Sequence, residues 1–87
     1  MDKDVTQIIY TNDPNQESKE IDVKEVLAKV YAALKEKGYN PINQLVGYFI
    51  SGDPTYITNY KGARGLIKRI DRDELLEVII NDYCSRL

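Results

Sequence analysis

Four basic side chains recur at spacings of three and four residues in the second half of the chain, as residues on one face of a helix do. They are Lys61, Arg64, Lys68 and Arg72. In a chain of 87 residues with a formal net charge of -2, this is the most concentrated positive stretch. The planar guanidinium group of arginine binds phosphate and carboxylate groups through paired hydrogen bonds. The basic row is therefore a candidate dock for a phosphate or an acidic partner.

Two other interpretations of this basic row stay open. It can be a solvated helix face whose charges are partly balanced by Asp71, Asp73 and Glu77. It can also contact nucleic acid, although an acidic domain lacks the broad positive potential that drives binding to a phosphate backbone. A small helical nucleic-acid-binding module is thus kept as the alternative function, with nucleic acid as a disfavoured partner.

Catalytic chemistry has little support in the composition. The chain has no histidine, so it lacks the usual general base at neutral pH and cannot form the common catalytic triads. Its single cysteine, Cys84, has no base near it in the sequence, and one cysteine without histidine makes a zinc site implausible. Gly62 and Gly65 lack the spacing of a phosphate-binding loop. We expect no catalytic residue, metal site or cofactor, and no enzymatic activity.

The acidic residues that could form catalytic pairs are better explained as helix caps. Asp22 is followed three residues later by Glu25, and Asp71 by Glu74, which is the spacing of a capping box. Two helices are predicted, one from Asp22 to a stop at Gly38 and one from Asp71 to the C-terminus. Their apolar residues at helical spacing are expected to pack inward: Val23, Val26, Leu27, Val30, Tyr31 and Leu34 in the first helix, and Leu75, Leu76, Ile79, Ile80 and Tyr83 in the second.

Between these helices, turn residues divide the chain into shorter elements. Asn40 before Pro41 predicts the start of a helix that Gly52 ends, and Asp53 before Pro54 predicts a further short helix or turn. A fourth helix is predicted at about residues 61–70, with the basic row on its outer side. Three tyrosines of this region are interface candidates because a tyrosine can bury its ring and keep its hydroxyl in water: Tyr39, Tyr48 and Tyr56.

Size and composition fix the class of protein. With 43% apolar residues, the chain can form one small domain, and a domain of this size buries only about 60 to 65% of its unfolded surface. No disulfide is possible with one cysteine, so self-association is the remaining source of extra stability. No segment is apolar enough to span a membrane, and the cytoplasm is the expected location. The predicted fold is all-α, a compact homodimeric bundle of four to five short helices (residues 21–87) with a flexible N-terminal arm (residues 1–20).

The N-terminal arm differs from the rest of the chain. Residues 11–20, TNDPNQESKE, are polar and rich in turn residues, and are expected to form a flexible linker. The preceding VTQIIYT is rich in β-branched residues, and it is expected to form a mobile arm or a strand on a partner. Thr6 and Thr11 are the hydroxyl groups there that a kinase can reach.

The run KGYNPINQLVGYFISGDPTYIT, followed by ARGLIKRIDRDELLEVIINDY, resembles the IreB family of small regulatory phosphoproteins of Firmicutes-type bacteria. The resemblance covers about residues 23–83. It implies an all-helical homodimer that acts downstream of a membrane Ser/Thr kinase with extracellular PASTA repeats, in cell-wall stress and cephalosporin tolerance. It also implies phosphorylation of threonines in the arm, where the acceptor position corresponds to Thr6 or falls on Val5, with Thr11 as the second candidate.

These inferences give one regulatory hypothesis. Phosphate on Thr6 would add about -1.5 to -2 charge to the arm. The basic row is the predicted place for it to bind, within one chain or across a dimer. The expected partners are a second copy, a Ser/Thr protein kinase and an unidentified downstream protein.

Overall fold

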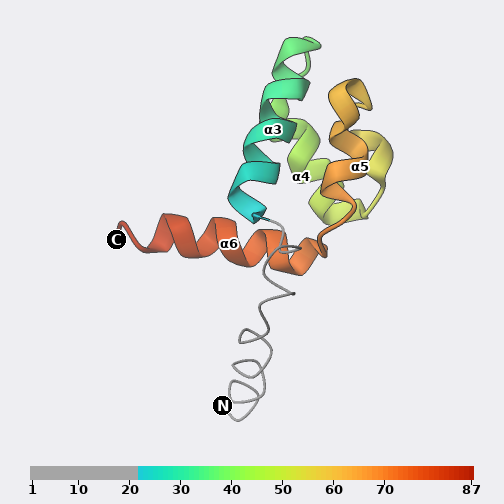
Figure 1. The fold of residues 1–87 in the computed structure, drawn as a ribbon. Coiled ribbons are helices and arrows are strands. Elements are labelled where there is room, and N and C mark those ends of the chain that lie inside the picture. The colour runs from blue at the N-terminus through green and yellow to red at the C-terminus, as the bar shows by residue number, and fades with distance from the viewer. Residues whose placement is uncertain (1–21) are drawn as a thin grey trace, which may run out of the picture.

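The computed structural model describes residues 22–87. In this range the elements are α3 (Val23–Glu36), α4 (Pro41–Ser51), the 3-10 turns η1 (Pro54–Tyr56) and η2 (Tyr60–Gly62), α5 (Ala63–Ile67) and α6 (Arg72–Cys84). No strand occurs among these residues. Helix α3 is central, because α4, α5 and α6 each contact it (Figure 1). The predicted all-α fold is confirmed, whereas the predicted arm, residues 1–20, lies outside the described residues.

Local hydrogen bonds fix both ends of α3. The Asp22 side chain accepts hydrogen bonds from the backbone N–H groups of Lys24 (3.0 Å) and Glu25 (3.4 Å), as its predicted capping role requires. At the other end Gly38 has φ +87°, and the N–H of Tyr39 donates to the carbonyl of Leu34 at 3.0 Å. This left-handed turn satisfies the last carbonyls of the helix and ends it where the sequence predicts.

The two predicted caps before prolines are also present. The Asn40 side chain accepts from the N–H of Asn43 at 3.2 Å, and α4 then runs to Gly52, which has φ +75°. The Asp53 carboxylate accepts from the N–H of Thr55 at 3.0 Å and from its hydroxyl at 2.7 Å. These two hydrogen bonds from Thr55 lower the pKa of Asp53, and the one from the backbone N–H has the larger effect. Asp53 therefore starts the tight turn η1.

Turn η1 is held against α4 by Tyr56. Its backbone carbonyl accepts a hydrogen bond of 2.8 Å from the side-chain amide of Gln44. Its ring lies on Gly47, where a Cβ atom would overlap the ring. The absence of a side chain at Gly47 thus lets the Tyr56 ring pack directly on the backbone of α4. Glycine inside a helix lowers helix stability by about 1 kcal/mol relative to alanine.

The predicted helix over residues 61–70 is wrong in its extent. Lys61 has φ +54° and Gly62 has φ +72°, so the backbone is left-handed at both positions and cannot continue as an α-helix. Helix α5 begins only at Ala63 and ends at Ile67. A second prediction also changes, because Asp71 occupies the N-cap position of α6 but its side chain makes no capping hydrogen bond.

The core is formed mainly around α3. Its buried residues come from every α-helix and from the segments that follow η1 and α5, and they form a single cluster. They are Val26, Val30, Ala33, Leu34, Tyr48, Ile57, Ala63, Ile67, Ile70 and Leu75.

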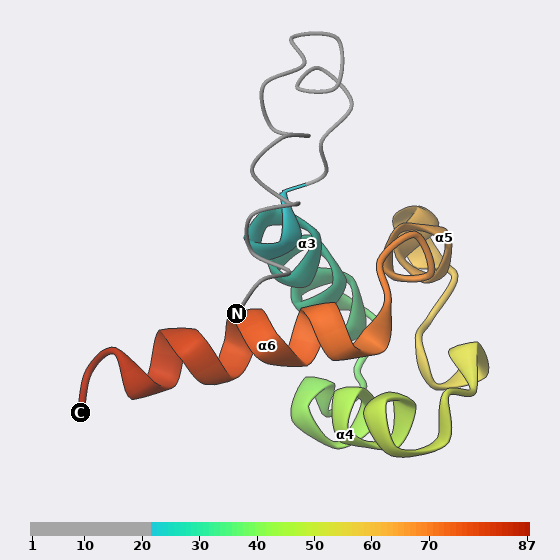
Figure 2. The same cartoon turned by 90° about the horizontal axis from the view of Figure 1, so that it is seen from below.

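The predicted inward stripe of α6 is buried only at its beginning. Leu75 is fully buried, but Ile79, Ile80 and Tyr83 are 37%, 56% and 61% exposed. Seen from below, α6 runs past α3 and continues beyond the other helices towards the C-terminus (Figure 2). The other helices therefore cover this segment only in part, and Ile79 and Tyr83 border an open groove that they share with Leu27 of α3.

We predict that Ile57 is a strong test of this core. It is fully buried although it lies in a loop, so Ile57→Ala should lower the free energy of unfolding by about 2–5 kcal/mol. Asn59→Ala is the matched control, because Asn59 is exposed and its side chain makes no capping bond, and it should change stability by less than about 0.5 kcal/mol. Urea denaturation of both variants measures the difference. Equal losses would show that Ile57 is not part of the core.

Candidate functional site

The structure separates the four residues of the predicted basic row. Lys61 lies in the left-handed turn before α5, and its Nζ is 3.3 Å from a carboxylate oxygen of Glu36 at the end of α3. Its hydrogen bond to Glu36 is the largest cause that lowers the pKa of that carboxyl, followed by a hydrogen bond from Tyr60. Lys61 therefore links α3 to the segment before α5.

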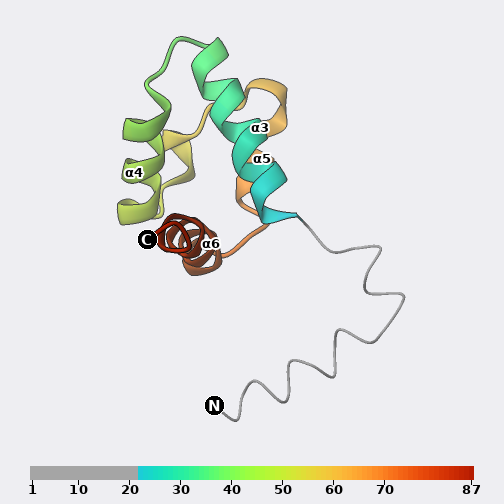
Figure 3. The same cartoon turned by 90° about the vertical axis from the view of Figure 1, so that its left-hand side faces the viewer.

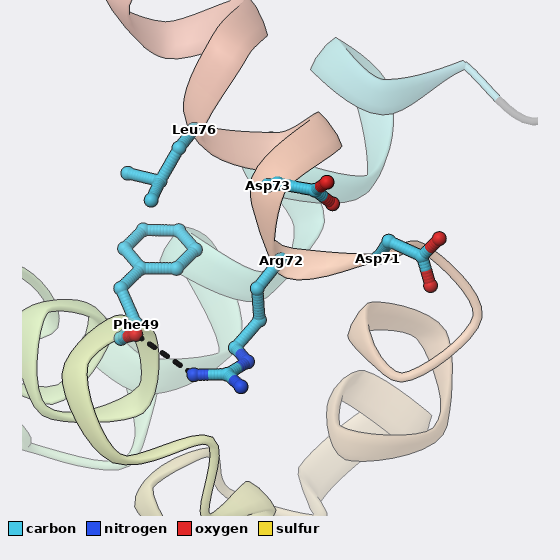
Figure 4. Close-up of a pocket in the computed structure, with 5 residues that line it drawn as sticks. All are labelled: Phe49, Asp71, Arg72, Asp73 and Leu76. Atoms are coloured by element: carbon cyan, nitrogen blue, oxygen red, sulfur yellow. Dashed lines mark hydrogen bonds between the residues drawn. The ribbon is translucent and has the colours of Figure 1, made fainter.

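The two arginines of the row bind backbone carbonyls. Arg64 is half-buried and donates from Nε to the carbonyl of Ile57 at 2.9 Å. Arg72 lies on the next helix, α6, and donates from Nη1 to the carbonyl of Phe49 at 3.0 Å (Figure 4). This carbonyl is in the last turn of α4, where a cation compensates the unpaired carbonyls and the negative end of the helix dipole. Both arginines thus stabilise the fold.

Lys68 is the remaining member of the row, and it is exposed just after α5. A phosphate dock made by all four residues would need Lys61 and the arginines to exchange their present contacts. The dock stays a prediction, and it does not correspond to one helix face in this structure. Gly62 is the sequence signal that could have warned of this, because a glycine there permits the left-handed turn that breaks the helix.

The three interface candidates among the tyrosines differ in exposure. Tyr48 is only 5% exposed and belongs to the core, so in this structure it offers no surface to a partner. Tyr39 is 49% exposed in the turn between α3 and α4. Tyr56 is 40% exposed although part of its ring covers Gly47. The other predicted site residues, Thr6 and Thr11, lie outside the described part of the chain.

The outer face of α4 is the clearest candidate surface. Ile42, Val46 and Ile50 recur every four residues along it, and they are 59%, 49% and 79% exposed. The helix sequence, PINQLVGYFIS, contains no charged residue. A contiguous apolar face on a helix without charges is costly to leave in water and is typical of a surface that binds another protein.

This α4 face continues onto α6. Phe49 of α4 and Leu76 of α6 line a shared open groove of about 570 Å³, and their side chains point towards each other (Figure 4). The rest of its lining is charged: Asp71, Arg72 and Asp73. Ile80 lies one helical turn beyond Leu76 and is 56% exposed. We define the α4–α6 face as Ile42, Val46, Phe49, Ile50, Leu76 and Ile80. The sequence pattern predicts that Leu76 and Ile80 pack inward, because helical spacing does not show which side a neighbour covers.

A second groove lies on another side of α6, between its C-terminal half and the N-terminal half of α3. Its lining is Lys24, Leu27, Val78, Ile79, Asp82, Tyr83 and Arg86, and its volume is about 330 Å³. Viewed so that the left-hand side of Figure 1 faces the reader, α6 is seen end-on below α3 and α4 (Figure 3). We call this the α3–α6 groove. Sequence analysis gave no sign of it, because it forms where two helices distant in the sequence cross.

The described residues therefore present two surfaces on which another molecule can bind. Among residues 22–87, no group of three or more acidic or cysteine side chains is placed to hold a metal ion. Within the same range, every helix is too short or too polar to cross a membrane.

Comparisons with known proteins agree on one family. Residues 6–85 match the family model described as IreB regulatory phosphoprotein. A relative from Ruminiclostridium cellulolyticum, named UPF0297 protein, is 65% identical over 65 residues, which cover 75% of this chain and 74% of the relative. The matched range extends from Thr6 through α6, so it includes the α4–α6 face and every residue of the α3–α6 groove except Arg86.

We predict that Gly52 and Arg72 act as one unit. Alanine at Gly38 or Gly52 must adopt a left-handed backbone, at a cost of about 1–2 kcal/mol each. At Gly38 the new Cβ would meet nothing, whereas at Gly52 it would lie 2.8 Å from the Arg72 guanidinium carbon. Gly52→Ala should therefore cost about 1 kcal/mol more than Gly38→Ala, because the hydrogen bond to Phe49 is disturbed.

The control for this prediction is a double-mutant cycle, measured by urea denaturation at one protein concentration. In an Arg72→Met background, Gly52→Ala should cost no more than Gly38→Ala. An excess cost that persists without Arg72 would contradict the proposed contact.

Proposed function

The chain belongs to the IreB family of regulatory phosphoproteins, and we propose that it acts without enzymatic activity downstream of a membrane Ser/Thr kinase with extracellular PASTA repeats. The proposed process is the response to cell-wall stress, including cephalosporin tolerance, and the proposed location is the cytoplasm. Family membership supports a regulatory role, and the kinase and the process come from the family resemblance.

The observation that carries the proposal is the α4–α6 face. A regulatory protein without catalytic groups must act by binding, and this face offers exposed apolar side chains on a helix without charge. The alternative function in nucleic-acid binding gains no support, because Lys61, Arg64 and Arg72 are each engaged with a group of the same chain. These contacts weaken the positive surface on which that alternative depends.

We further propose that the α4–α6 face is the homodimer interface. Interfaces of permanent homodimers are more apolar than ordinary protein surface and lack charged residues in their centre. The α4 part of the α4–α6 face has this composition, with Ile50 79% exposed in the single chain. Covering it with the same face of a second copy would remove the largest exposed apolar side chains of α4 from water. Tyr39, which lies just before α4, is a proposed edge of this interface.

Phosphorylation is proposed for Thr6, with Thr11 as the second acceptor. Thr6 is the first residue of the family match. The kinase is one proposed partner, and an unidentified downstream protein that distinguishes the phosphorylated from the unphosphorylated dimer is the other.

Thr6→Ala should remove most of the phosphate that the purified kinase domain of such a receptor transfers to this protein. Thr11→Ala is the matched control in the same arm, and it should retain the larger share of the incorporation. Mass spectrometry of the intact protein gives the amount of phosphate incorporated, and mass spectrometry of its peptides gives the phosphorylated residue. Phosphate found on neither threonine would contradict the proposed switch and leave family membership unaffected.

Val46→Asp should separate the dimer into monomers. Two charges on a self-associating apolar face must be desolvated together, which costs several kcal/mol and exceeds what the face gains by burial. Light scattering after size-exclusion chromatography should give about twice the 10.0 kDa chain mass for the natural sequence, and one chain mass for the variant. Ala28→Asp, on the exposed side of α3, is the control and should remain dimeric. A Val46→Asp protein that keeps the dimer mass would place the interface elsewhere.

A further inference from the structure

The α3–α6 groove has an apolar floor and a charged rim. Leu27 and Val78 are half-buried in it, and Ile79 and Tyr83 are 37% and 61% exposed. On the rim, Asp82 lies 3.8 Å from Nζ of Lys24 and 2.7 Å from Nη2 of Arg86. An apolar floor of this kind favours an apolar occupant, while the rim charges remain solvated and paired.

The charges lie differently on the two surfaces. On the α4–α6 face they lie beside Phe49 and Leu76 at the start of α6, and α4 itself carries none, whereas in the α3–α6 groove they come from both helices, as Lys24, Asp82 and Arg86. Interfaces that form and dissociate keep polar, accessible groups around an apolar centre. The groove is therefore suited to an occupant that binds reversibly.

The position of the groove points to the chain's own N-terminal segment. The described chain begins at Asp22, and the groove residues Lys24 and Leu27 follow two and five positions later. At a rise of about 1.5 Å per helical residue, Leu27 lies about 8 Å along the helix from Asp22. The groove thus opens beside the point where residues 1–21 attach.

The sequence of that segment fits the groove. Apart from Met1, all apolar residues among positions 1–20 fall within Val5–Tyr10, VTQIIY, which carries no charge. Its burial therefore requires no ionised group to leave water. Residues 11–21 connect it to α3, and eleven residues can span up to roughly 36–40 Å, which is ample for the chain to turn back. A tether of this length also gives a local concentration on the order of millimolar.

We propose that Val5–Tyr10 of the same chain occupies the α3–α6 groove, with Ile8 and Ile9 on its apolar floor. In this state Thr6 lies at the groove and is shielded from a kinase, which needs an accessible peptide. A phosphate group on Thr6 carries about -1.5 to -2 charge and would have to lose water beside an apolar floor, so phosphorylation and docking exclude each other. The exclusion between phosphorylation and docking rests on the proposed function, whereas the docking itself does not.

The docking is tested by NMR on the full-length protein. Ile8→Ser combined with Ile9→Ser should shift the amide resonances of Leu27, Val78 and Ile79 and leave those of α4 and α5 unchanged. Asn12→Ser combined with Asn15→Ser is the matched control, because it changes polar residues of the same segment and should leave the groove resonances in place. Unchanged groove resonances in the Ile8/Ile9 variant would overturn the proposal. Shifts confined to α4 would also overturn it, because the segment would then bind another surface.

A variant on the groove side tests whether the N-terminal arm or a second copy of the chain occupies the groove. Ile79→Ser removes an exposed apolar side chain of the floor, and circular dichroism checks that the helices remain folded. Release of the segment from the groove should also shift the amide resonances of residues 5–10 in this variant, although their own sequence is unchanged. Groove resonances that depend on protein dilution and not on these variants would show that a second copy fills the groove, and would overturn the proposal.

The kinase measurement distinguishes this inference from the proposed function. Ile79→Ser should raise the rate of Thr6 phosphorylation severalfold, and phosphorylated protein should show the groove resonances of the Ile8/Ile9 variant. Phosphorylated protein with unchanged groove resonances would overturn the exclusion between phosphate and docking. If no phosphate is transferred to the arm of any variant while the NMR shifts appear, docking is supported and the proposed switch fails.

Discussion

The rest of the structure depends on one constraint: the helices of residues 22–87 carry more apolar side chains than these residues bury among themselves. Only ten hydrophobic residues of the described part are buried, and they are gathered around α3. Helix α4 packs one side on this cluster and leaves Ile42, Val46 and Ile50 outside, and α6 runs beyond the cluster after Leu75. In a domain this small, burial is already a limited source of stability, so the uncovered faces are the places where binding adds most.

Elements determined by short-range hydrogen bonds could be predicted from the sequence. Asp22, Asn40 and Asp53 each bond a backbone N–H two or three residues later, and therefore a local pattern is sufficient to place three element starts. The same reasoning failed at residues 61–70, where spacing suggested a helix and the left-handed backbone at Lys61 and Gly62 interrupts it. Gly62 carries the relevant signal, because a glycine permits the left-handed backbone that apolar periodicity does not indicate.

Features that depend on contacts distant in the sequence could not be predicted. The hydrogen bond from Arg72 to the carbonyl of Phe49 joins residues 23 positions apart, and it converts a supposed phosphate ligand into a support for the end of α4. The exposure of Ile80 has the same origin, since helical spacing identifies an apolar stripe but not whether another helix reaches it. The candidate surfaces therefore appeared only when the positions of α4 and α6 relative to α3 were known.

The two uncovered sides of α6 have different proposed roles. The α4–α6 face, whose α4 part carries no charge, suits a permanent partner of identical sequence, and the α3–α6 groove with its charged rim suits a segment that binds and leaves. A dimer would then hold two such grooves in fixed positions, each beside the start of its own arm. Regulation by phosphate would act on the groove and leave the dimer unchanged.

The most direct test of the central claim is isotope-filtered NOE spectroscopy on an equal mixture of labelled and unlabelled chains. The account predicts intermolecular NOEs between the methyl groups of Ile42, Val46 and Ile50 on one chain and the α4–α6 face of the other. Intermolecular NOEs that involve only other surfaces, or none at millimolar protein concentration, would contradict it.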